Sequence, residues 1–294
     1  MTMRVLLATD GSTDAQAAAA ALAEFPLPTD TTVRVMTVAG VTPGSLDIPT
    51  VRDFQASLRQ EARAVADRTC ARLAGRVRTV EAHVVEGDPR EALVRAAEDW
   101  PADLVVVGAR GLSVMAGLLL GSVSLAVARH APCPVLVVKS GARRLRHILV
   151  AIDGSEPAQA AVKFVARLPL DPTLLVQVLG VVERPRFPSA APVAVTGHLR
   201  AAVEQLLAER MTSLGLALEQ AVDAFGPRAP SVERRIAVGD PTDQIVRAAD
   251  TADTDLVVVG ARGLGALKRL LLGSVSEAVL RSAERSVLIV RAAG

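Results

Sequence analysis

Aromatic residues are almost absent from this chain. Of its 294 residues, none is tyrosine, one is tryptophan and five are phenylalanine, so aromatic residues make up only 2%. The hydrophobic cores must therefore consist of alanine, valine, leucine and isoleucine, and small alanine faces let helices lie close to a sheet. Hydrophobic residues make up 50% of the chain and charged residues 22%. This composition provides sizeable cores and excludes a chain that is disordered throughout.

Cysteine is also scarce, and neither sign of charge dominates. Cys70 and Cys133 are the only cysteines. Two thiols in a chain of this length favour a reducing compartment, so we expect a cytoplasmic protein, and they lack the spacing of metal ligands. The formal net charge is only +2, and no cluster of Lys and Arg resembles a nucleic-acid-binding surface. We interpret the densest basic run, Gly141–His147, as a solvated linker.

Hydrophobic runs that could cross a membrane are lacking as well. The first apolar run meets Asp10 too early for a signal peptide. One uncharged segment of 18 residues, Gly111–Ala128, is close to the lower limit for a spanning helix. Its second copy, described next, contains Lys268, Arg269 and Glu277, which fit poorly into a membrane interior. We therefore expect no membrane partner for either copy.

The chain does contain an internal repeat. Residues Asp103–Val127 and Asp255–Val279 are identical at 19 of 25 aligned positions, at an offset of 152. The segments Val5–Ser12 and Ile148–Ser155 repeat at an offset of 143, so the second copy has nine more residues (152 − 143) before its later part. We place these residues in a loop around Glu183–Gly197, which is rich in proline and alanine.

Length and repeat together predict two domains, at residues 1–140 and 146–294. In the first copy we expect strands at 4–10, 32–40, 80–87, 102–110 and 133–140, and helices at 13–25, 51–75, 88–100 and 122–130. Strands that are apolar on both faces and separated by helices indicate a parallel sheet covered on both sides, with right-handed crossovers. The predicted fold class is α/β: two tandem doubly wound, Rossmann-like domains, each a five-stranded parallel sheet with helices on both faces.

The repeated segment places glycines where such folds bind ligands, beyond the carboxyl ends of the strands. Gly108 ends the fourth strand, and Gly111 and Gly121 follow it. Glycine allows the backbone to approach a ligand closely, and the free N–H groups after Gly121, with the hydroxyls of Ser122 and Ser124, form a good anion site. We therefore predict a phosphate cradle in each copy. Asp10 and Asp153 end the first strands at the same edge, where each could bind ribose hydroxyls or reach a metal held by the phosphates.

Structural alternatives stay open for each of these residues. The glycines could form ordinary turns, Ser122 could be a simple N-cap, and Asp10 and Asp153 could cap the following helices. We interpret the two Gly-Asp-Pro turns, Gly87–Pro89 and Gly239–Pro241, as starts of helices only. The chain has neither the G-x-x-x-x-G-K-[ST] of a P-loop nor a G-x-G-x-x-G after its first strand.

These residues resemble the universal stress protein family in its tandem form, over nearly the whole chain. The family marker G-x2-G-x9-G-[ST] fits both copies, and in that family it marks the branch that binds ATP. The resemblance implies ATP or a related adenine nucleotide as ligand, accompanied by Mg²⁺, and pairing of the fifth strands, here Pro134–Val138 with Val287–Arg291, in addition to a homodimer. The residues that it assigns to the nucleotide are Ala8, Asp10, Val38, Gly108, Arg110, Gly111, Gly121, Ser122, Val123 and Ser124, and then Ala151, Asp153, Val181, Gly260, Arg262, Gly263, Gly273, Ser274, Val275 and Ser276.

The sequence offers little for hydrolysis. Arg110, Arg262, Ser122 and Ser274 could stabilise a γ-phosphate, but hydrolysis also needs a base that positions water. None of the four histidines recurs between the copies, and no Ser/His/Asp set recurs. We therefore predict a nucleotide-dependent regulator or sensor of the stress response with absent or slow hydrolysis. The alternatives are an active ATPase and a nucleotide-free dimeric scaffold. The sequence does not identify a protein partner.

Overall fold

The structure is a computed structural model that describes residues 2–40, 49–112, 120–139, 144–183, 193–226, 231–263 and 272–292. The first half contains β1 (Met3–Ala8), α1 (Thr13–Glu24), β2 (Thr31–Ala39), α2 (Pro49–Leu73), β3 (Thr79–Glu86), α3 (Pro89–Asp99), β4 (Leu104–Gly108), α4 (Ser122–His130) and β5 (Val135–Val138). The second half contains β6 (His147–Ile152), α5 (Glu156–Ala166), β7 (Leu175–Val182), α6 (Val193–Asp223), β8 (Ser231–Val238), α7 (Pro241–Thr251), β9 (Leu256–Gly260), α8 (Ser274–Ser282) and β10 (Ser286–Val290).

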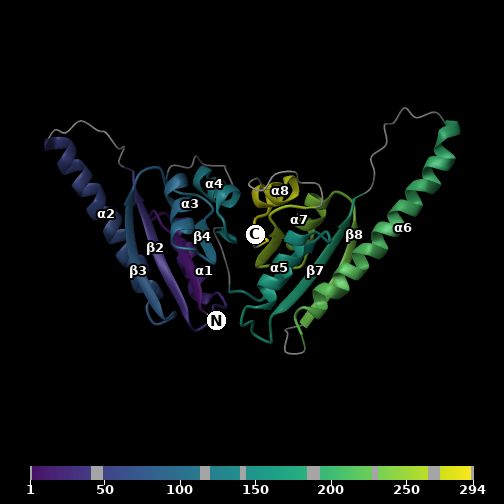
Figure 1. Cartoon of the computed structure of the whole chain (residues 1–294), viewed down its shortest axis with the longest axis horizontal. Coiled ribbons are helices and arrows are strands. Elements are labelled where there is room, and N and C mark those ends of the chain that lie inside the picture. Colours follow the sequence, from purple (N-terminus) through teal and green to yellow (C-terminus); the bar gives the residue numbers. More distant parts are fainter. Residues whose placement is uncertain are drawn as a thin grey trace.

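These strands form one sheet of ten strands in the order β3-β2-β1-β4-β5-β10-β9-β6-β7-β8. Within each half, five neighbouring strands are parallel. The predicted α/β fold with a doubly wound five-stranded sheet in each copy is confirmed. Figure 1 shows the two halves side by side, with the long helices α2 and α6 at opposite outer ends.

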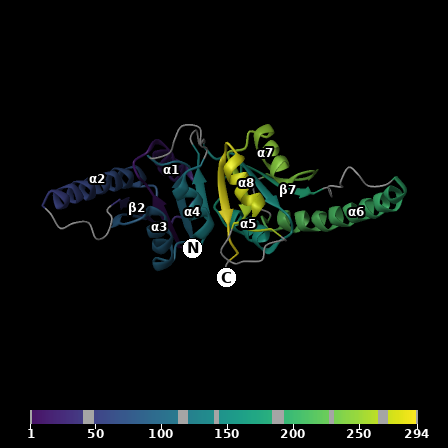
Figure 2. The same cartoon turned by 90° about the horizontal axis from the view of Figure 1, so that it is seen from above.

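The two halves join through their fifth strands. β5 and β10 pair antiparallel, with Leu136 opposite Leu288 and Val137 opposite Val287. The internal pairing that the family resemblance implied is therefore present. Because this seam is a row of strand hydrogen bonds, the two sheets are one continuous structure, and β10 and α8 lie next to the first half when the molecule is viewed from above (Figure 2).

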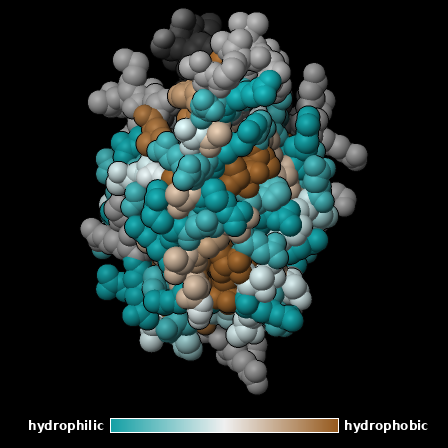
Figure 3. Space-filling model, turned by 90° about the vertical axis from the view of Figure 1, so that its left-hand side faces the viewer, coloured by the Kyte–Doolittle hydropathy of each residue, from teal (hydrophilic) through white to brown (hydrophobic). Residues whose placement is uncertain are grey.

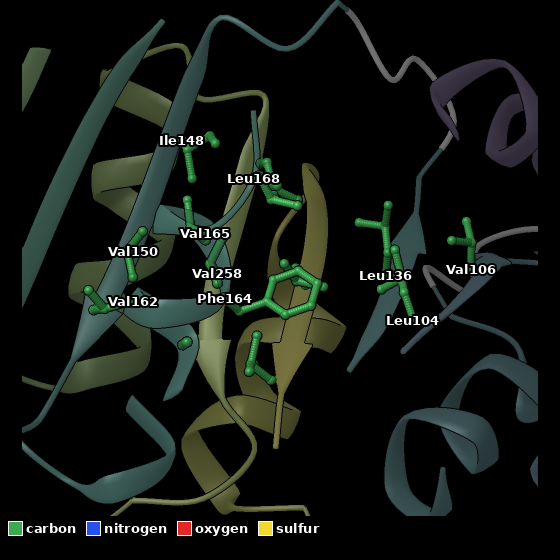
Figure 4. Close-up of a cluster of buried hydrophobic side chains, with 14 of the residues drawn as sticks. Leu104, Val106, Leu136, Ile148, Val150, Val162, Phe164, Val165, Leu168 and Val258 are labelled. Atoms are coloured by element: carbon green, nitrogen blue, oxygen red, sulfur yellow. The ribbon is translucent and has the colours of Figure 1, made fainter. Parts of the chain in front are cut away.

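Helices cover both faces of the sheet. One face packs against α1, α2, α5 and α6, and the other, which we call the α4 face, packs against α3, α4, α7 and α8. Each core continues across the seam. Figure 4 shows Leu104, Val106 and Leu136 of the first half and Phe164 of the second half within one buried cluster. The buried faces are mostly Val, Leu and Ala, as the lack of aromatic residues predicted.

Two sequence interpretations need correction. The loop placed at Glu183–Gly197 is wrong at its end, because α6 begins at Val193; the additional proline-rich residues 184–192 lie outside the described part of the chain. The linker interpretation of Gly141–His147 is wrong at His147. This residue begins β6, is buried, and has its Nδ1 2.7 Å from the carbonyl oxygen of Ala252.

The outer ends of the sheet are more polar than its middle. Every second residue at the start of the end strand β3 is exposed, including Thr79 and Glu81. Figure 3, which looks onto this end, shows mainly hydrophilic surface with small, separate hydrophobic areas. In the described part of the chain, no helix is long and apolar enough to span a membrane.

Candidate functional site

The predicted site residues meet at one edge of the sheet in each half. β1 and β4 are neighbours, and from them the strand order runs outward in opposite directions, so they mark the point where it reverses. Asp10 follows β1 and Gly108 ends β4. Asp153 and Gly260 have the same positions at β6 and β9. This is the edge where open α/β sheets bind ligands.

The first glycine of each motif is required by packing. A Cβ atom on Gly108 would lie 2.6 Å from the carbonyl carbon of Asp14, at the start of α1. On Gly260 it would lie 2.7 Å from backbone atoms of Pro157 and Ala158, at the start of α5. No side chain fits at these distances. The close approach brings the first turn of each helix next to the exit of the strand.

The aspartate after the first strand joins two loops. Asp10 accepts the N–H of Ser12 on Oδ1 at 3.0 Å and the N–H of Leu112 on Oδ2 at 2.9 Å. Gly111 makes space for this carboxylate, because a Cβ there would lie 2.6 Å from Asp10 Oδ2. In the second half Asp153 likewise accepts the N–H of Ser155, at 3.0 Å.

Asp10 and Asp153 are not the N-caps of the helices that follow them. In each half the N-cap is the serine two residues later. Ser12 is the N-cap of α1 and accepts the N–H of Ala15, and Ser155 is the N-cap of α5 and accepts the N–H of Ala158. Asp88, in the first Gly-Asp-Pro turn, caps α3, and Asp240 caps α7. The interpretation of both turns as helix starts is confirmed.

Helices α4 and α8 begin differently from these four. Their N-caps are Gly121 and Gly273, and neither helix has a side-chain hydrogen bond at its cap. The alternative that Ser122 is the N-cap is therefore wrong, since Ser122 is the first helical residue. The first N–H groups of a helix attract anions when no side chain satisfies them. Both halves thus hold an uncapped helix start at the same place.

Backbone contacts fix these helix starts beside the strand exits. Gly121 donates its N–H to the carbonyl of Ala109 at 2.7 Å, and Gly273 donates to Ala261 at 2.7 Å. One turn later, the buried hydroxyl of Ser124 donates to the carbonyl of Gly108 at 2.6 Å, and Ser276 donates to Gly260 in the same way. Ser122 and Ser274, by contrast, are exposed at the helix start.

The buried serines have a structural role that their motif position did not reveal. Each has one hydroxyl proton, which is used in the bond to the strand. They tie α4 to β4 and α8 to β9. Contact of Ser124 or Ser276 with a nucleotide stays a prediction.

The motif arginine differs between the halves. Arg110 donates from its backbone N–H (3.0 Å) and Nε (2.9 Å) to Asp14 Oδ2, and from Nη2 (3.2 Å) to Oδ1. Asp14 is only 3% exposed, so this is a bidentate pair with a buried carboxylate. In the second half Pro157 occupies the place of Asp14, so this buried pair is not repeated with Arg262. Sequence reasoning missed Asp14.

Small apolar residues line the sheet next to these polar groups. Ala8, Val38 and Val123 are partly buried and pack on the α4 face of the core, as do Val181 and Val275. Their counterpart Ala151 is buried in the same cluster. Apolar side chains on the face that carries α4 can pack against a flat base, while the helix start can hold phosphates.

None of the four histidines occupies an equivalent position in the two halves. His83 and His130 are exposed, His147 is held within β6, and the side chain of His198 lies outside the described residues. In the described ranges no three His, Cys, Asp or Glu side chains group together as a metal site. Burial raises the pKa of the Cys133 thiol to about 12, which makes it unreactive at neutral pH.

The fold defines a tandem α/β protein in which each half places a glycine-capped helix start at the edge where the strand order reverses. The model of the universal stress protein family matches residues 1–139 and 144–291. The chain belongs to this family.

Individual relatives agree with this assignment. A universal stress protein of Mycobacterium tuberculosis is 32% identical over 224 residues, which cover 72% of this chain and 69% of that protein. One of Mycobacterium bovis is 33% identical over 229 residues, covering 74% and 71%. The crystal structure of a universal stress protein from Archaeoglobus fulgidus covers 98% of this chain and 96% of its own, with 22% identity and a TM-score of 0.65, and shows the same fold.

Proposed function

We propose that each half binds ATP or a related adenine nucleotide, and that the protein acts as a nucleotide-dependent regulator or sensor of the stress response. The observation that supports this most is the pair of glycine-capped helices, α4 and α8. Every other helix whose N-cap is described carries a side-chain cap. The free helix starts face the edge where the strand order reverses, and the phosphates would bind there.

The remaining residues fit the other parts of such a ligand. Val38 would contact the adenine, with Ala8 lining the same pocket, and Val123 would lie against the ribose and phosphates. Asp10 would accept hydrogen bonds from the ribose while it holds the loop. A Mg²⁺ ion would arrive with the phosphates and supply charge neutralisation. The corresponding residues of the second half would hold a second nucleotide.

We further propose that hydrolysis is slow or absent. Asp10 follows β1 at this edge, and both of its carboxylate oxygens already accept backbone N–H groups. The arginine that could stabilise a γ-phosphate, Arg110, is paired with Asp14. An active ATPase of the same fold would need a base that positions water.

The proposed assembly is a homodimer of the whole chain in the cytoplasm. Large hydrophobic side chains are exposed on the outer helices, with Phe54 of α2 at 64% and Leu216 of α6 at 57%. Association of two copies would cover such side chains. Light scattering coupled to size-exclusion chromatography measures the mass in solution, and a mass of one chain would contradict the dimer.

The nucleotide content of the purified protein tests the central proposal. We expect close to two ATP per chain after denaturation and anion-exchange chromatography, and an increase in melting temperature when Mg-ATP is added to stripped protein. Bound ADP or AMP would favour the ATPase, and competition with AMP and cyclic AMP would identify the preferred nucleotide. No nucleotide and no change in melting temperature would leave only a scaffold.

A further inference from the structure

The first turn of α8 contains a negative charge that the first turn of α4 lacks. Glu277 lies in the first turn of α8, three residues after Ser274. The first half has Leu125 at the corresponding position, 152 residues earlier. A carboxylate this close to the start of α8 opposes the binding of a phosphate there, unless another charge compensates it.

The bidentate partner of Glu277 comes from the other half of the molecule. Arg129, in the last turn of α4, donates Nη2 to Glu277 Oε1 at 2.6 Å and Nε to Oε2 at 3.0 Å. Both carboxylate oxygens are thus engaged across the seam. Arg281, on the same helix as Glu277, reaches only Oε1, at 3.0 and 3.1 Å.

This pair is partly shielded from water and is charged. The side chain of Glu277 is 22% exposed and that of Arg129 is 38% exposed. Hydrogen bonds from Arg129 are the main cause that lowers the pKa of Glu277 below its ordinary value, with a smaller effect from Arg281. Glu277 therefore carries its charge at neutral pH, and a partner is needed to offset it.

The seam holds α4 and α8 in place for this contact. Arg291, which follows β10, donates Nη2 to the carbonyls of Ala128 and Arg129 at 2.8 and 2.6 Å, at the end of α4. Lys139, which follows β5, donates to the carbonyls of Leu280 and Ala283 at the end of α8. Each helix is therefore capped by a cation from the opposite half.

We infer that Arg129 of the first half is a positioning residue of the second nucleotide site. It neutralises Glu277 and directs this carboxylate toward the seam, so that the uncapped start of α8 can accept a phosphate. The first site has no counterpart of this dependence, because Leu125 carries no charge. The inference rests on the proposed binding of nucleotide in both halves.

The test first inactivates one site at a time by placing a negative charge at its helix start. Ser122→Glu leaves only the second site and Ser274→Glu leaves only the first; both serines are exposed, so the fold is preserved. Affinity for ATP is measured by titration calorimetry. In the Ser122→Glu protein, adding Arg129→Met should weaken ATP binding roughly three- to tenfold. In the Ser274→Glu protein the same change should leave the affinity within about twofold.

Rescue distinguishes neutralisation of charge from a general loss of structure. Adding Glu277→Leu, which introduces the residue type of the first half, should restore the affinity lost in Arg129→Met, because no carboxylate remains to compensate. Arg285→Met is the matched control, since this arginine pairs with Asp253, outside α8, and should change neither affinity. Melting temperatures without nucleotide verify that all variants are folded.

The other possible results contradict either the inference or the proposed function. If ATP binds the Ser122→Glu protein and Arg129→Met does not weaken it, or Glu277→Leu does not restore it, the inference is wrong while the proposed function stands. If Arg129→Met weakens both sites equally, the residue has only a structural role. If neither single-site protein nor the unmodified chain binds ATP, the proposed function fails, and the inference fails with it.

Discussion

The two halves share a motif but not the charges around it. In the first half, the motif arginine Arg110 is held by the buried carboxylate of Asp14, within the same half. In the second half that carboxylate is replaced by Pro157, and a new one, Glu277, is compensated from across the seam by Arg129. The Arg110–Asp14 pair thus lies within one half, whereas the bidentate partner of Glu277 belongs to the other half. After duplication, a glycine framework can stay fixed while its surrounding charges diverge.

The largest effect on stability should come from the first motif glycine and should be equal in the two halves. Unequal losses would show that the halves differ in packing as well as in charge. Gly108→Ala and Gly260→Ala each place a Cβ within 2.7 Å of backbone atoms in the following helix. We expect each to lower the free energy of unfolding by about 3 kcal/mol, measured by urea denaturation. Gly215→Ala is the control: its Cβ would meet nothing within 4 Å, and in a helix it should stabilise by about 0.5–1 kcal/mol.

Removal of the buried carboxylate should affect only the first half. Asp14→Ala leaves Arg110 without its bidentate partner, and we expect a loss of about 2 kcal/mol, reduced because Arg110 is 41% exposed and can turn to water. Pro157→Ala, at the equivalent place, should change the free energy of unfolding by less than about 0.5 kcal/mol. Equal losses in the two variants would contradict the asymmetry.

The two seam cations should differ in their response to pH. Burial lowers the pKa of Lys139 from 10.5 to about 8. The folded state therefore binds fewer protons than the unfolded state between these values, so this residue makes stability rise with pH. The gain between pH 7 and 9 should be about 1 kcal/mol.

Comparison of variants isolates this contribution from other titrating groups. Urea denaturation at pH 7 and 9 should show a smaller rise for Lys139→Met than for the unmodified protein. Arg291→Met should keep the full rise, because an arginine does not lose its proton in this range, even though burial also lowers the pKa of Arg291. An unchanged rise in Lys139→Met would mean that the lysine keeps an ordinary pKa.

The smallest effect concerns the serine caps and should again be symmetrical. Ser12→Ala and Ser155→Ala each remove the hydrogen bond at the start of α1 or α5. We expect each to cost roughly 0.5–1 kcal/mol in thermal or urea denaturation. Ser57→Ala, which removes a hydroxyl from the exposed surface of α2, should cost less than either. A much larger cost in one half would reveal a difference that the backbone geometry does not show.

The sequence was sufficient for features that depend on short segments. Apolar runs between helices predicted the parallel strands, and Asp88 before a proline predicted the start of α3. The repeated glycine motif was enough to single out Gly108 and Gly121. The seam was expected only because the chain resembles a known family; periodicity alone does not pair β5 with β10.

The features that the sequence did not reveal depend on distant partners. Asp14 looks like an ordinary first-turn acid until the fold brings it to Arg110, 96 residues away. Arg129 and Glu277 are separated by 148 residues. Neither pair has a local pattern, because charges meet across a sheet only after strand order and register are set. Glu277 did carry one signal: it interrupts an otherwise identical stretch of the repeat.

The antiparallel seam also has a consequence during synthesis. β5 ends at Val138, but its partner β10 begins at Ser286, 148 residues later. At about 5–20 residues per second, a ribosome needs roughly 7–30 s to add these residues. Throughout that interval the finished first half exposes an open strand edge made of Val and Leu, which invites pairing with a neighbouring nascent chain. Strand β10 is therefore the one that closes this edge of β5 to other copies of the chain.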